Sequence, residues 1–268
     1  MSVLTSYASA SARDSAAPAA SNTGLCIFRS DTKAIEVSDG TNYRIYNNDG
    51  FISPTASEYL TNNYSGVFDG VNDFISIGTI ATLNSSTDFT VTGWFNYDTL
   101  QTVIISSGTS TSARLAIRPE STSSIRVTLM GNIYDVSLGI SGGISSCTWY
   151  HFACVINGTS LTLYINGSAS DGGSATVSSL SSGWADGLDI GRNTPNWTAS
   201  PRYFDGKLDE LAVFDSALTS TQVADIYNSK LYTSFVAMYR LENGVTDETG
   251  NYNGTNNGVT FSTSDKPY

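Results

Sequence analysis

The connection around residue 200 carries the side chains best suited to contact a sugar. The stretch GRNTPNWTASPRYFDG, residues 191–206, joins two predicted strands. Aromatic rings stack on sugar faces, while guanidinium and amide groups hydrogen-bond to hydroxyls. This composition predicts a glycan-binding loop with the following candidate contacts: Arg192, Asn193, Trp197, Arg202 and Tyr203. The alternative is that Trp197 closes the edge of the fold or a contact between subunits.

Residues suited to acid–base or nucleophilic catalysis are scarce. His151 is the only histidine, so a Ser-His-Asp or Cys-His mechanism would have to use it, and a multi-histidine metal site is excluded. It lies inside a predicted strand, which favours a structural role. Asp209 and Glu210 are adjacent in a strand and are therefore expected on opposite faces, where they cannot flank one glycosidic bond. Asp186 and Asp189 are expected to form a turn, so we expect no enzyme.

The composition points to an acidic all-β protein. The 268 residues include 13 Lys+Arg and 24 Asp+Glu, a formal net charge of −11. Binding to nucleic acid would need clustered cations, so that partner is excluded. Long helices usually carry more Glu, Lys and Arg than the 14% of charged residues present here. No apolar run approaches the ~20 residues that a bilayer crossing needs, so no membrane partner is expected.

The N-terminus and the cysteines predict folding in a reducing compartment. The opening MSVLTSYASASARD lacks the basic start and apolar core of a secretory signal. The three cysteines, Cys26, Cys147 and Cys154, cannot all pair within one chain, and reduced thiols are expected. The sequence therefore predicts folding in the cytoplasm without the usual secretion route.

The chain is expected to divide into three parts. Residues 1–24 are small and polar, and are interpreted as a low-complexity arm or linker. Residues 25–50 contain three short apolar runs separated by turn residues, which predicts a β-meander that packs on the rest of the chain or on a partner. Residues 51–268 show persistent alternation, with runs such as FTVTGWFNY bounded by turn residues, as in an antiparallel sandwich. One short helix is predicted in SALTSTQVADIYNS, where Thr219 and Gln222 have capping-box spacing.

Four phrases in this third part resemble the laminin-G-like branch of the concanavalin A-like lectin and glucanase superfamily. They are GVFDGVNDFISIG (66–78), DFTVTGWFNY (88–97), TWYHFACVINGTSLTLYING (148–167) and LDIGRN…FDGKLDELAVFDSALTSTQVADIYN (188–228). Their order and spacing match the family over roughly 170 residues. The resemblance implies an all-β, two-sheet antiparallel jelly-roll sandwich, in which His151 belongs to a strand.

The resemblance also bears on metal binding and catalysis. Domains of this type often hold calcium near the rim, which makes calcium the candidate cofactor, with carboxylates as its preferred ligands. The carboxylates in the matching turns and strands are Asp69, Asp73, Asp209 and Asp247, although turn formation also explains some of them. The superfamily's glucanases carry a Glu-x-Asp-x-x-Glu strand, and this sequence has none.

The C-terminal segment resembles the part that normally opens such a domain. The stretch SFVAMYRLENGVTDETGNYNGTNNGVTFST, residues 234–263, follows the predicted helix instead. Either residues 234–268 supply a circularly permuted first strand, or a truncated second domain begins there. We favour permutation, which is tolerated where termini lie close together at the surface.

The predicted meander resembles short segments of phage tail-fibre and virion structural proteins. The shared pattern runs through Arg29–Lys33, Ser38–Thr41 and Tyr43-Arg44. It implies a virion surface protein, a head decoration or a fibre, that is assembled in the host cytoplasm and becomes extracellular after lysis. Residues 1–50 would contact other virion proteins or form a trimer, and the sandwich would bind cell-surface glycans. The alternative is a free bacterial lectin-like protein, and a glycoside hydrolase or lyase is a more distant one.

Overall fold

The chain divides into two units, Met1–Thr61 and Asn62–Tyr268. The computed structural model describes the second unit over residues 62–109, 112–138, 142–177, 187–193, 202–229 and 234–268, and the first unit through the backbone of its strands. Each unit is considered by itself. In the described parts of the chain, no helix is long and apolar enough to cross a membrane.

The first unit contains a five-stranded sheet in the order β1-β2-β3-β4-β5. Its strands are β1 (Thr5–Tyr7), β2 (Cys26–Arg29), β3 (Ala34–Ser38), β4 (Tyr43–Tyr46) and β5 (Ile52–Ser53). The three strands predicted as a meander are β2, β3 and β4, and they pair antiparallel in sequence order. β1 lies within the segment interpreted as an arm and pairs parallel with β2.

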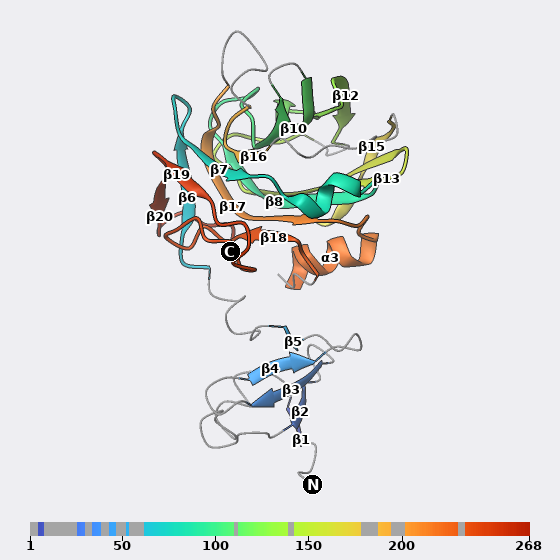
Figure 1. Cartoon of the computed structure of the whole chain (residues 1–268), viewed down its shortest axis with the longest axis vertical. Coiled ribbons are helices and arrows are strands. Elements are labelled where there is room, and N and C mark those ends of the chain that lie inside the picture. The colour runs from blue at the N-terminus through green and yellow to red at the C-terminus, as the bar shows by residue number, and fades with distance from the viewer. Residues whose placement is uncertain are drawn as a thin grey trace. The chain divides into compact units, whose positions relative to one another are not determined.

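The second unit is a sandwich of two antiparallel sheets, as the sequence predicts (Figure 1). The first sheet runs in the order β12 (Asn132–Ser137), β11 (Ser124–Leu129), β10 (Ser112–Ser121), β9 (Ile105–Thr109), β16 (Leu188–Ile190), β7 (Phe74–Gly78) and β19 (Thr255–Asn257). The second runs in the order β15 (Ser168–Thr176), β14 (Ser160–Ile165), β13 (Tyr150–Asn157), β8 (Phe89–Tyr97), β17 (Asp205–Phe214), β6 (Ser65–Asp69) and β20 (Thr260–Ser262), and β18 (Ala237–Tyr239) also pairs with β17.

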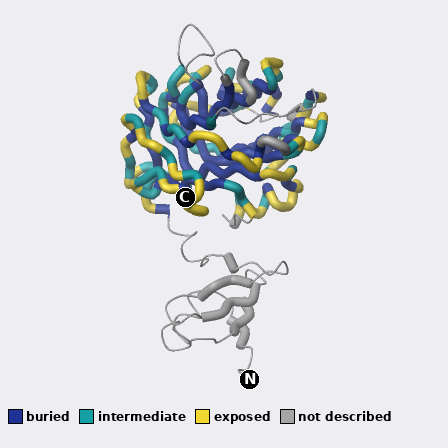
Figure 2. The backbone as a smooth tube through the Cα atoms, in the orientation of Figure 1, coloured by how far each residue is buried: buried dark blue, intermediate teal, exposed yellow. Residues whose placement is uncertain are grey.

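Alternating apolar side chains form the core between the two sheets. On β8, Phe89, Val91, Phe95 and Tyr97 all belong to this core, as their period of two predicts. The central strands, such as β8 and β17, are almost entirely buried, whereas the edge strands β12, β19 and β20 are mostly exposed or half-buried (Figure 2). This core fixes the strand ends, and the loops at those ends form the candidate site.

The helix predicted near residue 220 is α3 (Ser220–Ser229), which lies outside the second sheet (Figure 1). The Gln222 backbone N–H donates to Thr219 Oγ1 at 3.2 Å, and Thr219 N–H donates to Gln222 Oε1 at 2.9 Å. These reciprocal bonds are the predicted capping box. Tyr227 of this helix stacks on Trp94, with ring centroids 5.6 Å apart. A short 3-10 helix, η2 (Ala81–Ser85), precedes β8.

Residues 234–268 contribute strands to both sheets. β18 pairs with β17 and β20 pairs with β6 in the second sheet, whereas β19 pairs with β7 in the first. All three residues of β18 are buried. The segment is therefore part of the sandwich unit, and its circular permutation relative to other domains stays a prediction.

Candidate functional site

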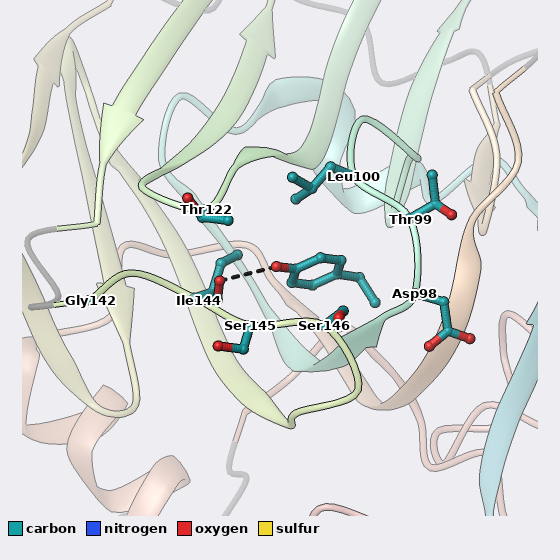
Figure 3. Close-up of a pocket in the computed structure, with 9 residues that line it drawn as sticks. Asp98, Thr99, Leu100, Thr122, Gly142, Ile144, Ser145 and Ser146 are labelled. Carbon is teal, nitrogen blue, oxygen red and sulfur yellow. Dashed lines mark hydrogen bonds between the residues drawn. The ribbon is translucent and has the colours of Figure 1, made fainter.

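An open pocket lies at one end of the sandwich, where β8 runs into the following loop (Figure 3). Its volume is about 610 Å³. Three separate segments of the chain form it, and the lining residues are Tyr97, Asp98, Thr99, Leu100, Thr122, Gly142, Ile144, Ser145 and Ser146. Leu100 and Thr122 lie across the pocket from Ser145 and Ser146 (Figure 3).

Backbone hydrogen bonds hold the three segments together. Ile144 N–H donates to Thr122 O at 2.7 Å, and Cys147 N–H donates to Tyr97 O at 3.0 Å. The phenol of Tyr97 donates to Ile144 O at 3.1 Å (Figure 3). Gly143 has φ 71°, and a Cβ atom there would lie 2.3 Å from Thr122 O, so this close approach requires glycine. The pocket is thus a fixed part of the fold.

The pocket combines hydroxyl groups with apolar surface. Thr99, Thr122, Ser145 and Ser146 bring hydroxyls to the lining, whereas Leu100 supplies an apolar side chain. Hydroxyls both donate and accept hydrogen bonds, and apolar surface packs on the C–H faces of a sugar ring. Together with the carboxylate of Asp98, which also lines the pocket, these groups suit a polyhydroxylated ligand.

Two titratable groups at the pocket are held in their neutral forms. Burial raises the pKa of the Tyr97 phenol, with smaller contributions from nearby ionisable groups. The thiol of Cys147 donates to Asp98 Oδ1 at 3.3 Å, and this bond is the main reason that its pKa is raised. A thiol with a raised pKa is a poor nucleophile, so Cys147 is not an activated cysteine.

Two of the predicted glycan contacts gather on an aromatic ring at the base of the connection. The guanidinium carbon of Arg192 lies 3.4 Å from the centre of the Phe74 ring, and the Tyr203 ring centroid is 6.4 Å from that of Phe74. Arg192 Nε also donates to Asp189 Oδ2 at 2.9 Å. Arg192 and Tyr203 pair through an isolated bridge, which closes the base of the connection.

Asn193 and Arg202, the other two predicted glycan contacts that the structure describes, connect the base of the connection to the pocket. Asn193 is only 1% exposed, and its Oδ1 accepts the Arg202 N–H at 2.5 Å. Arg202 Nη1 donates to Gln101 O at 3.1 Å, next to pocket residue Leu100. Asn193 therefore joins the two ends of the connection, whereas Arg202 reaches the pocket rim. Trp197, the fifth predicted contact, lies outside the described residues.

Sequence reasoning missed Phe74 and the pocket itself. Phe74 ends the phrase FDGVNDF, and an aromatic residue directly after a turn was an available signal. The pocket had no local signal, because Thr122 and Ser145 stand in short, unremarkable turn sequences and meet Leu100 only through the fold.

Asp69 and Asp73, two of the four predicted calcium ligands, share the turn between β6 and β7. Asp69 Oδ1 accepts the Val71 and Asn72 N–H groups at 2.8 and 3.2 Å, and these bonds lower its pKa. Asp73 is 7% exposed, and its Oδ2 accepts the Asp69 N–H at 3.1 Å. Burial raises the pKa of Asp73. Both carboxylates thus support the turn.

The other two predicted ligands belong to separate networks. Asp247 is buried, and accepts Met238 N–H at 2.9 Å and Tyr252 N–H at 3.1 Å. Asp209 is buried in β17, where its Oδ2 accepts Asn62 Nδ2–H at 2.6 Å. Among the described residues, no three acidic, histidine or cysteine side chains converge in an arrangement that could hold a metal ion.

The expected separation of Asp209 and Glu210 onto opposite faces is wrong. The register of β17 against β8 shifts between Asp209 and Ala212, and Glu210 has φ 49°. Such a bulge rotates the second residue, so that both side chains reach one buried cluster. In that cluster Asn62 bonds to Asp209, and Arg240 Nε lies 3.4 Å from Glu210 Oε1.

His151 has the structural position that the sequence predicts. It is buried, and its Nε2 lies 2.8 Å from Thr92 Oγ1. The imidazole also packs edge-on against Trp94, with ring centroids 5.3 Å apart. It therefore belongs to the packing beneath α3 and not to the pocket.

The fold and the site together define a lectin-like sandwich with a pocket at its rim. The sequence matches the family model of the concanavalin A-like lectin/glucanases superfamily, laminin-G-like, over residues 69–224, more than half of the chain. The protein therefore belongs to this superfamily. A search of curated protein sequences finds no match.

Two solved structures show the same fold. A candidate carbohydrate-binding protein from Bacteroides ovatus matches with a TM-score of 0.59 and 22% identity, covering 78% of this chain and 62% of that one. The present chain thus spans less than two thirds of that protein. The heptameric SAP-like pentraxin of Limulus polyphemus matches with a TM-score of 0.57 and 18% identity, covering 76% of this chain and 96% of that one.

Proposed function

We propose that this protein is a non-enzymatic carbohydrate-binding protein and that the pocket between loop 98–101 and segment 142–146 receives the glycan. The observation that carries the proposal is the lining of this pocket, in which the hydroxyl residues Thr122, Ser145 and Ser146 lie together with the apolar side chain of Leu100. Ligand pockets commonly have volumes of ~300–1,000 Å³. A volume of about 610 Å³ lies within that range.

The pocket lining contains a single carboxylate, that of Asp98. Glycosidases use two carboxyl groups that flank the scissile bond. The adjacent pair Asp209 and Glu210 is buried with Asn62 and Arg240, and neither residue lines the pocket. The single histidine, His151, is buried as well. These positions support binding without turnover.

The first unit supports a display role for the sandwich. Its strands are two to five residues long, and sheets this small usually need a partner to be stable. We propose that residues 1–50 attach the protein to a virion or form a trimer, so that several sandwiches face one glycan surface. Weak sites present in several copies then bind with useful avidity. A free bacterial lectin is the alternative.

Filling the pocket tests the proposed site. Ser145 is exposed at the lining, so Ser145→Tyr should place a ring in the pocket without disturbing the core. Ser160 is exposed at the hairpin between β13 and β14, away from the pocket lining, and Ser160→Tyr is the matched control. On a glycan array, Ser145→Tyr should weaken binding by about tenfold or more, whereas Ser160→Tyr should bind like the wild-type protein.

Two other outcomes would count against this assignment. Equal binding by Ser145→Tyr and wild type, with unchanged melting temperatures, would exclude the pocket as the glycan site. No retained glycan for the wild-type protein would contradict the carbohydrate-binding function itself. Immunogold labelling of particles from the producing culture separates the two proposed settings. Label on particles supports the virion, and soluble antigen with unlabelled particles supports the free lectin.

A further inference from the structure

Three arginines lie close together beside the pocket. Arg118 and Arg126 are directly opposite one another on β10 and β11, and Asp135 of β12 is opposite Arg126. Like charges directly opposed on a sheet destabilise it unless a counter-charge bridges them. Glu120 provides that bridge, because its carboxylate lies 2.7 Å from Arg118 Nη2 and 3.1 Å from Arg126 Nη2.

Both carboxylates in this group, Glu120 and Asp135, form ion pairs with arginines. Asp135 accepts Arg126 Nε–H at 2.6 Å and Nη2–H at 2.7 Å, a bidentate pair. This hydrogen bonding lowers the pKa of Asp135 and raises that of Arg126. Glu120 is shared between Arg118 and Arg126. The two carboxylates therefore balance two of the guanidinium groups.

The third guanidinium belongs to Arg202. In the described part of the sandwich no carboxylate pairs with it, and its Nη1 donates only to a neutral carbonyl, Gln101 O. Arg118 is 9% exposed, and its pKa is lowered first by burial and also by the nearby charges of Arg202 and Arg126. The three arginines and two carboxylates of this group together carry an excess of one positive charge. This excess is notable in a protein whose formal net charge is −11.

The arginines are joined to the pocket by one loop. Gln101 N–H donates to Pro119 O at 2.7 Å, next to Arg118, while Gln101 O accepts from Arg202. The neighbouring residue Leu100 lines the pocket. A polysaccharide with one sugar in the pocket can therefore extend across this loop to the guanidinium groups.

We propose that Arg118 and Arg202 form a subsite for an anionic substituent of the bound polysaccharide, a uronate carboxylate or a sulfate ester. Guanidinium groups bind such planar or multidentate oxyanions through strong, charge-assisted hydrogen bonds. The anion supplies a negative counter-charge for Arg202 and offsets the electrostatic repulsion between Arg118 and Arg202. This inference rests on the proposed glycan-binding function and assigns its ligand class.

The test measures binding of the full chain to three matched polysaccharides: polygalacturonate, its carboxyl-reduced neutral form and a sulfated galactan. Arg202→Gln removes the unpaired charge while leaving an amide that can still bond to Gln101 O. It should weaken binding to the acidic polysaccharide by about tenfold or more. Arg202→Lys keeps the charge but loses the forked geometry of the guanidinium, so it should weaken binding less than Arg202→Gln. The control Lys266→Gln removes a cation elsewhere and should change nothing.

The possible outcomes distinguish a failure of the proposed anion subsite from a failure of the proposed carbohydrate-binding function. Arg202-dependent binding to polygalacturonate or to the sulfated galactan identifies a carboxylate or a sulfate ligand, respectively, and raised salt should weaken it. Binding to the neutral form alone, or equal binding by Arg202→Gln, overturns the subsite and leaves the proposed function intact. A chain that binds none of the three here and nothing on the glycan array overturns both.

Discussion

At the scale of single residues, the buried pair Asp209 and Glu210 has the largest energetic consequence. Both are almost completely buried, and burial raises the pKa of each carboxyl group. For Glu210 the pKa rises from 4.5 to about 7, although Arg240 and the Tyr268 phenol act in the opposite direction. The fold therefore favours the protonated carboxyl group, which needs no counter-charge.

This shift predicts that stability depends on pH near neutrality. A carboxyl group whose pKa is higher in the folded state stabilises the fold below its unfolded pKa, and that contribution is lost as pH rises through the folded value. Raising the pH from 5 to 8 should therefore lower the stability of the wild-type protein by on the order of 3 kcal/mol. Calorimetric melting across this range measures the effect.

Two variants check the assignment to Glu210. Glu210→Gln is neutral at every pH, so its melting temperature should change less between pH 5 and 8, with Asp209 responsible for the remainder. Asp225→Asn, at an exposed position on α3, is the control and should follow the wild-type profile. A Glu210→Gln profile as steep as that of the wild type would show that another group titrates.

At the scale of elements, β17 connects most of the sandwich. It pairs with β8 on one side and with β6 and β18 on the other. Its bulge brings Glu210 to Arg240, which directly follows β18. Residues 234–268 thus complete the surroundings of β17 with strands and with a counter-charge.

Removing this segment should abolish cooperative unfolding. Deletion of residues 234–268 exposes the buried faces of β17 and β6 and removes the core residues Tyr239, Leu241 and Val259. Loss of one large buried side chain costs ~2–5 kcal/mol, a large share of the ~5–15 kcal/mol by which most domains are stable. Thermal melting followed by near-ultraviolet circular dichroism measures the loss. A truncated chain with the melting curve of the full chain would favour the alternative that a second domain begins at residue 234.

At the scale of the whole molecule, the chain divides into Met1–Thr61 and Asn62–Tyr268, to which we assign two proposed roles. The second unit has its own core, formed between its two sheets, and contains the pocket and the arginines. The first unit has short strands and is the candidate for attachment or oligomerisation. The two roles can therefore be tested independently.

Residues 62–268 alone should fold and bind glycan. Their melting curve should match that of the sandwich in the full chain, and their affinity for a soluble oligosaccharide should be equal. On an immobilised glycan surface the full chain should bind more tightly by on the order of 10²-fold, if residues 1–50 form a trimer. Surface plasmon resonance compares the two proteins. Equal binding by both at the surface would contradict a multivalent assembly through the first unit.

Much of the fold was predictable because its signals are local. The alternation of FTVTGWFNY places Phe89 and Phe95 in the core, and the spacing of Thr219 and Gln222 predicts the capping box of α3. The superfamily likewise followed from short phrases in a fixed order. Of the candidate site, the sequence indicated Arg202 as a ligand contact, a role that remains a prediction.

The sequence by itself thus determined the class of fold, the positions of most strands and the structural role of His151. Only the tertiary structure decided what those strands bring together. It joins Leu100, Thr122 and Ser145 in one pocket and rotates Glu210 into the cluster of Asp209. It also links Arg202 through Gln101 to Pro119, the residue after Arg118. Hydrophobic alternation acts over a few residues and is therefore visible in the sequence. Strand pairing and bulges depend on contacts between distant segments, and no local pattern records them.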